Sequence, residues 1–406
     1  MPKKNYGLIL FLCIGQYFSQ GLSSLPDQAI YYLTRESWKL SASLIGFITF
    51  ITAVAWYLKI IFAYFIDNVS IKGKTTTYYL YFSYILILLS CFYIVFFGLN
   101  LISLIIIGIL INIGVAFADV SVDKHMAQIE KKEKIAGKIQ SQQWTSLGIA
   151  GLIVALGGAW IAKTWSAPLN YKIAYGLYSI VPIILLFFLF FYFKEPIKHK
   201  KAVSFKSIIK ANFKELKNKK FLIGLLFIAC LQLSPSFGLP LMIKCREVLK
   251  VSKMFLGVLG ALGTVLGVIG YLIYYKWVYK FNTKKMLYFM VVFSGLTNLF
   301  YLYLPNKWVL LSYNVLFGAF SGITFMILLA FFVRIIPTGF EAFFYALVTS
   351  ISNFCARGGS FFGGLIYDKT NYETAVIVSS VLTLICVFFI PHLKLNNQKM
   401  IRVSEI

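Results

Sequence analysis

Charged residues are scarce in this chain of 406 residues, and acidic residues are the scarcest of them. Charged residues make up 13% of the sequence, with 14 Asp and Glu against 39 Lys and Arg, whereas about 25% is usual for a soluble domain. Hydrophobic residues reach 59%, and the mean hydropathy is +0.79. This composition excludes a soluble protein and indicates an integral membrane protein. Because cations gather in the cytoplasmic loops of membrane proteins, the net charge of +25 indicates topology rather than nucleic-acid binding.

Residue clusters that hold metals or carry out catalysis are also missing. The six cysteines are scattered without a CxxC pair, and the three histidines form no ligand cluster, which argues against a disulfide framework and a metal site. No nucleophile–base set and no nucleotide-binding motif is present, so neither an enzyme nor a cofactor is expected. The regularly spaced glycines from Gly257 to Gly270 lie inside an apolar run and therefore predict close helix packing rather than a phosphate loop.

Long apolar runs are abundant instead. A membrane-spanning helix needs roughly 20 apolar residues, and twelve segments meet this requirement: 7–33, 42–66, 75–98, 101–126, 140–164, 173–194, 221–245, 253–278, 285–304, 307–334, 339–366 and 371–393. The first is read as an uncleaved span rather than a signal peptide, since no small-residue cleavage pattern follows it. With both termini in the cytoplasm, most Lys and Arg residues fall on the cytoplasmic side, as the positive-inside rule requires.

An internal repeat divides the chain into two halves. Residues 35–46 align with residues 246–257 at an offset of 211, and five of the twelve positions are identical. Two parallel six-span repeats are the plan of the major facilitator superfamily, in which the substrate binds between the halves near the midplane. We therefore expect an all-α fold with six-helix halves at 1–194 and 221–406. The linker 195–220 is expected to form an amphipathic helix on the cytoplasmic leaflet, although a solvated basic linker is the alternative.

One arginine, Arg357, interrupts an apolar segment. It shares a helical face with Asn353 and a stripe of small or polar residues. A cation inside a bilayer is costly and usually faces a wet cavity or a substrate path, so Arg357 and Asn353 are candidate substrate-binding residues. Glu341 begins the same segment and is a candidate gating residue, with helix capping as the alternative.

Other polar residues at membrane depth complete the candidate site. Gln20 and Asp27 share a face of the first span, and Lys59 lies in the second. Asp27 and Lys59 are further substrate-binding candidates, because a charge at such depth is functional by default, with a structural role as the alternative. Gln20 is a third candidate on the same polar face as Asp27. In the fourth span Asp119 and Asp123 lie near the cytoplasmic end; they serve either proton coupling or a gating salt bridge.

Asp67, in the loop after the second span, is followed by Lys72 and Lys74. This acidic-then-basic pattern is similar to a loop signature of facilitator proteins. It favours a gating role for Asp67 over substrate contact.

One motif is distinctive: residues 337–353 read Pro-Thr-Gly-Phe-Glu-Ala-Phe-Phe-Tyr-Ala-Leu-Val-Thr-Ser-Ile-Ser-Asn. On this motif, and on weaker similarity in residues 21–26, 56–67 and 119–123, the chain resembles the folate-biopterin transporter family, a branch of the major facilitator superfamily. The sequence departs from the family pattern at Ile60 and Ala63 and in the weakly basic loop 71–74. The resemblance implies uptake of folates or reduced pterins, often with protons as the coupling ion.

The residues present suit such a ligand. Arg357 or Lys59 can receive a carboxylate of the glutamate tail, and the planar fork of an arginine allows two parallel bonds. Asp27, Asp119 or Asp123 can accept hydrogen bonds from the aminopyrimidine edge of a pterin. We therefore expect a secondary active transporter with a folate or pterin-like substrate.

A facilitator for another organic anion, a nucleoside or a drug is the alternative, because fold does not determine cargo. A membrane enzyme or a receptor is less compatible with the absence of a catalytic set and of a long soluble segment. The expected location is the cell (inner) membrane, with the lipid bilayer as partner and no nucleic acid.

Overall fold

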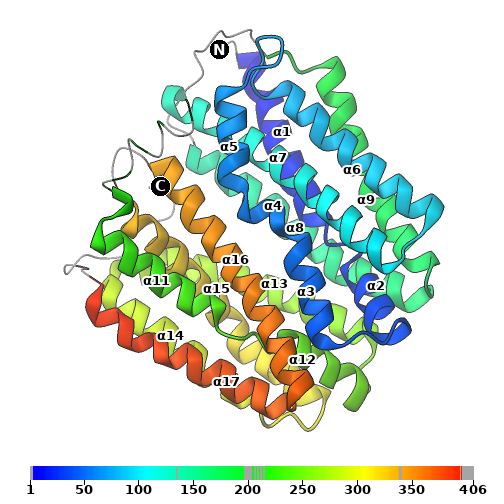
Figure 1. Cartoon of the computed structure of the whole chain (residues 1–406), viewed down its shortest axis with the longest axis vertical. Coiled ribbons are helices and arrows are strands. Elements are labelled where there is room, and N and C mark those ends of the chain that lie inside the picture. Colours follow the sequence, from blue (N-terminus) through cyan, green and yellow to red (C-terminus); the bar gives the residue numbers. More distant parts are fainter. Residues whose placement is uncertain are drawn as a thin grey trace. The chain divides into compact units, whose positions relative to one another are not determined.

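Every named element in the described part of the computed structural model is a helix (Figure 1). The structure describes residues 3–133, 136–195, 204, 207, 210, 213, 215–337, 341–393 and 395. It describes the backbone alone for residues 3–6, 127–133, 136–138, 140, 141, 341 and 342. Within these residues nine helical stretches are long and apolar enough to cross a membrane. The described residues of the three remaining predicted spans, 42–66, 285–304 and 339–366, are also mainly helical, which is consistent with twelve. The protein is a multi-pass, all-α membrane protein.

The chain forms two compact units, each described here by itself. One combines Met1–Ser37 with Ile51–Ile208, and the other combines Trp38–Phe50 with Ile209–Ile406. The helices of the first unit are α1 (Lys3–Leu22), α2 (Asp27–Tyr31), η1 (Tyr32–Ser37), α4 (Val54–Tyr57), α5 (Lys59–Asn68), α6 (Thr77–Phe97), α7 (Leu101–Glu133), α8 (Ala136–Thr164) and α9 (Leu169–Phe191). Helix α3 (Ala42–Thr52) falls across the boundary.

The second unit contains α11 (Lys219–Leu233), α12 (Gly238–Ile243), η2 (Lys244–Val248), α13 (Lys253–Lys276), η3 (Val278–Lys280), α14 (Thr283–Phe300), α15 (Lys307–Ile335), α16 (Glu341–Lys369), α17 (Tyr372–Ile385) and η4 (Cys386–His392). Most of the predicted linker helix at 195–220 lies outside the described residues. That helix therefore stays a prediction.

In the first unit, α1 packs along α8, and α6 runs between α7 and α9 (Figure 1). An aromatic stack joins three of its helices. The Phe117 ring of α7 lies 4.1 Å from the ring of Phe62 on α5 and 5.8 Å from that of Tyr79 on α6, between ring centroids. Since aromatic pairs contribute about 0.5–1.5 kcal/mol beyond their buried area, this stack holds α5 firmly against α7. The charged residues that these helices carry are thereby brought together.

In the second unit, α13 and α15 approach each other closely through glycines. A Cβ atom on Gly270 would lie 2.1 Å from the Ala319 carbonyl oxygen, and one on Gly322 would lie 2.2 Å from the Gly267 carbonyl oxygen. Only glycine permits such backbone contact. The expectation that the glycines from Gly257 to Gly270 serve helix packing is confirmed at Gly270 and at the Gly267 backbone.

The repeated segment has the same backbone conformation in both of its copies. A single π-helical turn, η1 or η2, ends the first span, and a lysine in the left-handed region follows it: Lys39 has φ 56° and Lys250 has φ 50°. In the second copy the Val251 N–H donates to the Cys245 carbonyl oxygen at 2.8 Å. This bond spans six residues and closes the turn around Lys250, a left-handed position of the kind that glycine usually occupies at helix ends.

Candidate functional site

The second predicted span is broken twice, and the second break positions Lys59. The helical path is interrupted at Ala53 (φ −84°, ψ 7°) and Leu58 (φ −95°, ψ 10°), so α3, α4 and α5 follow one another as short helices. Lys59 is the first residue of α5. Discontinuous membrane helices are typical of transporter binding and coupling sites.

Lys59 binds the two carboxylates of α7. Its Nζ forms an ion pair with Asp119 Oδ2 and lies 3.9 Å from Asp123 Oδ2. The two acids stand four residues apart and therefore share one helical face. The Asp119 side chain is only 3% exposed, whereas Lys59 is 22% and Asp123 32% exposed. Two carboxylates thus share one ammonium group, and only Asp119 of the three groups is buried.

Two hydrogen bonds frame this cluster. The Tyr17 hydroxyl of α1 donates to Asp123 Oδ1 at 3.0 Å, and the Trp56 indole of α4 donates to Asn112 Oδ1 of α7 at 2.8 Å. The Lys59 ammonium also lies 5.7 Å from the centroid of the Trp56 ring, within reach of a cation–π interaction. Side chains of α1, α4, α5 and α7 therefore hold one charged centre.

A second ion pair lies at the end of α5. Lys124 Nζ is 3.1 Å from Asp67 Oδ1 and donates to the Ile66 carbonyl oxygen at 2.5 Å. Lys124 is 11% exposed but Asp67 is 62% exposed, so water screens the carboxylate and the pair is weak. Its position supports a structural or gating role rather than substrate contact.

The two candidates of the first span have different surroundings. Gln20 is half-buried, and its Oε1 has no hydrogen-bond partner in the part of the chain that the structure describes. Asp27 is exposed at the start of α2. Gln20 therefore keeps an acceptor available for a ligand or a water molecule, because buried polar atoms normally have a partner.

In the second unit Arg357 stands on α16 as an exposed cation. It has no acidic partner among the described residues, and Asn353 one turn before it is half-buried. The surrounding stripe is not uniform: Ser350 is buried, and the Gly359 carbonyl accepts a hydrogen bond from the Ser236 N–H at 2.9 Å. Arg357 is therefore available to an anionic ligand, while neighbouring small residues pack on the break between α11 and α12. Glu341 begins α16, and its side chain lies outside the described residues.

A carboxylate that the sequence did not single out is Glu195. It accepts hydrogen bonds from the backbone N–H groups of Thr75, Thr76 and Thr77 at 2.8–3.1 Å, and from the hydroxyls of Thr75 and Thr77. Glu195 thereby caps the N-terminus of α6 from the far end of the unit's sequence. Burial alone would raise the pKa of Glu195, but these hydrogen bonds lower it from 4.5 to about 2.

This contact predicts an acid-sensitive contribution to stability. Because the pKa of Glu195 is lower in the folded than in the unfolded protein, its contribution is complete above about pH 4.5 and lost as pH falls toward 2. We expect Glu195→Gln to lower the free energy of unfolding by about 1–2 kcal/mol at pH 7. Thermal unfolding in detergent from pH 7 to pH 3 checks this. A difference between the two proteins that stays constant over that range would contradict it.

Three contributors escaped sequence reasoning for identifiable reasons. In the sequence, Tyr17 and Trp56 look like ordinary aromatic residues of a membrane span. Only the packing of α1 and α4 on α7 brings the Tyr17 hydroxyl to Asp123 and the Trp56 indole to Asn112. Glu195 is separated from its threonines by about 120 residues. The only sequence feature that could have indicated this contact was a single acidic residue at the end of the sixth span.

Comparison with known proteins agrees with this architecture. The model of the BT1 family matches residues 20–402. A folate-biopterin transporter of Synechocystis sp. is 23% identical over 86% of this chain and 72% of its own length. Folate transporter 1 of Plasmodium falciparum is 24% identical over 94% of this chain and 78% of its own length.

Among solved structures, the nucleoside transporter NupG superposes with a TM-score of 0.69 at 12% identity, covering 97% of this chain and 99% of that one. A D-xylose-proton symporter gives 0.68 at 14% identity, covering 96% and 99%. These likenesses establish the major facilitator fold. Because the family model matches nearly the whole chain, this protein belongs to the BT1 family.

Proposed function

We propose that this membrane transporter moves folates or reduced pterins by secondary active transport, with protons as the coupling ion. The relatives named as folate and folate-biopterin transporters support the substrate class. The observation that carries the chemistry is Arg357, an exposed cation with no acidic partner among the described residues. A guanidinium group binds a carboxylate with two parallel hydrogen bonds, which suits the glutamate tail of a folate.

The Lys59 cluster supports proton coupling. Two carboxylates on α7 share one ammonium group, so an added proton would neutralise the excess negative charge at Asp119 or Asp123. Protonation would also weaken the hold of Lys59 on α7, because an ion pair loses its attraction when one partner becomes neutral. In this proposal Asp119 and Asp123 serve coupling, Asp67 serves gating, and Arg357, Asn353 and Gln20 bind substrate. Roles for Lys59 and Asp27 in substrate binding and for Glu341 in gating remain predictions.

The proposed organisation follows from the sequence. Six-helix halves at 1–194 and 221–406 are joined by the linker 195–220, both termini lie in the cytoplasm, and the host membrane is the cell membrane. The positive-inside distribution of Lys and Arg supports this orientation.

Uptake into liposomes tests the function directly. The purified full-length protein is reconstituted, a proton gradient is imposed, and accumulation of folate, biopterin and unrelated anions is followed. We expect folate and biopterin to accumulate, to compete with each other, and to leak out when an ionophore collapses the gradient. If neither accumulates while another organic anion, a nucleoside or a drug does, the substrate assignment is wrong. Uptake that is indifferent to the gradient would contradict proton coupling alone.

A further inference from the structure

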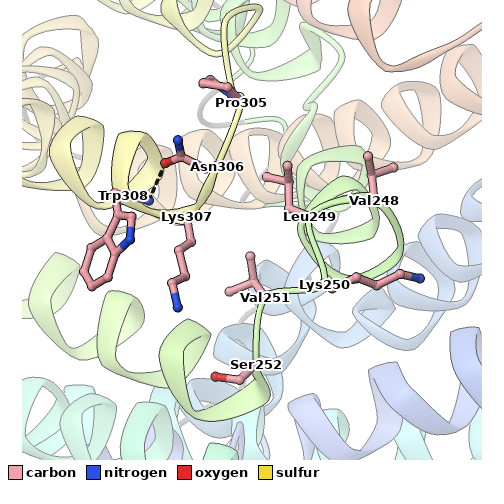
Figure 2. Close-up of a pocket in the computed structure, with 9 residues that line it drawn as sticks. All are labelled: Val248, Leu249, Lys250, Val251, Ser252, Pro305, Asn306, Lys307 and Trp308. Carbon is pink, nitrogen blue, oxygen red and sulfur yellow. Dashed lines mark hydrogen bonds between the residues drawn. The ribbon is translucent and has the colours of Figure 1, made fainter.

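A polar pocket lies at one end of the second unit, apart from Arg357. Two segments form its cavity of about 480 Å³: Val248–Ser252, from the end of η2 to the start of α13, and Pro305–Trp308, which runs into the first residues of α15 (Figure 2). Three candidate membrane spans, Lys219–Val248, Lys253–Lys280 and Lys307–Ile335, end or begin at these segments. The pocket therefore lies at the membrane surface, at the depth of lipid headgroups.

The pocket carries positive charge without an acid to balance it. Its lining contains Lys250 and Lys307 but no Asp or Glu, and no ion pair joins either lysine to an acid in the described part of the chain. Figure 2 shows the Lys307 side chain extending toward Val251 and Ser252, while Lys250 stands on the far side of its loop. Lys307 therefore supplies the cation inside the pocket, and Lys250 adds to the field at its edge.

Two long helices begin at the same pocket. Ser252 caps α13 by accepting from the Phe255 N–H, and Asn306 caps α15 by accepting from the Trp308 and Val309 N–H groups. The positive ends of two helix dipoles thus add to the two lysines. Trp308 and Val248 are 61% and 67% exposed, so apolar and aromatic surface borders the charged centre. Tryptophan at this depth is typical of the interface between lipid and water.

Lys250 occupies a backbone conformation that favours glycine. Its φ of 50° is strained for a residue with a Cβ atom. Lys39 occupies the matching turn of the first copy of the repeat with φ 56°, which supplies a control of equal strain that does not line this pocket.

We infer that this pocket binds the phosphate group of an anionic phospholipid. Lys307 is the principal cation, the N-terminal ends of α13 and α15 and Lys250 contribute positive potential, and Trp308 packs against the glycerol and the first acyl carbons. The position at the span ends and the exposed apolar border indicate a membrane lipid rather than free phosphate as the source. The inference is independent of the transported substrate.

Native mass spectrometry of the detergent-purified full-length protein tests the inference. The protein is titrated with phosphatidylglycerol, phosphatidylcholine, glycerol 3-phosphate and inorganic phosphate. We expect phosphatidylglycerol to bind at least tenfold more tightly than the other three, Lys307→Gln to weaken its binding about tenfold, and Lys307→Arg to retain it. Unchanged phosphatidylglycerol binding by Lys307→Gln would overturn the site. Equal binding of glycerol 3-phosphate would overturn the lipid as its source.

A pair of glycine variants separates binding from folding. Lys250→Gly and Lys39→Gly both relieve a left-handed backbone, so both should raise the unfolding temperature in lipid-free detergent. Only Lys250→Gly should reduce phosphatidylglycerol binding, by about threefold. If the two variants change lipid binding equally, the positive charge of Lys250 does not contribute to binding, and that part of the inference is wrong.

Discussion

Lys59→Met is expected to abolish uptake and to lower the free energy of unfolding by about 3 kcal/mol. The loss arises because Asp119, 3% exposed, would keep a buried charge without its cation. The partial exposure of Lys59, 22%, places the expected cost at the lower end of the range for buried pairs. Uptake should be lost because no cation remains between Asp119 and Asp123 to respond to a proton. Urea unfolding and liposome uptake measure the two effects separately.

Two variants control this experiment. Adding Asp119→Asn to Lys59→Met removes the buried unpaired charge, so stability should return while uptake stays absent. Lys124→Met breaks the ion pair with Asp67, which is 62% exposed, and should cost no more than about 1 kcal/mol. If Lys59→Met is as stable as Lys124→Met, the buried charge of Asp119 does not carry the expected energetic cost. Normal uptake by Lys59→Met would assign the cluster to structure alone.

Arg357→Ala should reduce folate uptake about 30- to 100-fold and leave stability within about 0.5 kcal/mol of the parent protein. The arginine is exposed and has no acidic partner among the described residues, so its removal strands no buried charge. Loss of a charge-assisted pair of hydrogen bonds costs about 2–3 kcal/mol of binding. Initial uptake rates at several folate concentrations, together with thermal unfolding, measure both quantities.

The choice of substrate sharpens this prediction. Biopterin lacks the glutamate tail, so Arg357→Ala should impair its uptake far less than that of folate. Arg357→Lys keeps the charge but not the planar fork, and should give an intermediate folate rate. Lys369→Ala, at the exposed end of the same helix, should change neither rate. Equal impairment of folate and biopterin by Arg357→Ala would contradict a carboxylate-binding role.

Sequence reasoning was strongest where one physical requirement governs many residues. A bilayer demands that backbone hydrogen bonds close within each span, so apolar runs alone predicted the helices and the all-α fold. It was weakest within the second span, where α3, α4 and α5 succeed one another at Ala53 and Leu58. No glycine or proline lies at either break, so the usual sequence signal of an interrupted helix was absent.

The sequence by itself determined the membrane class, the helical elements, the repeated turn and the short set of polar residues at membrane depth. Only the tertiary structure decided which of these residues meet: Lys59 with Asp119 and Asp123, Tyr17 with Asp123, and Glu195 with the start of α6. It also showed that Arg357 is exposed, whereas Lys59 is already paired. The physical reason is that hydropathy is a property of each segment, whereas an ion pair depends on the rotation and contact of helices far apart in the chain.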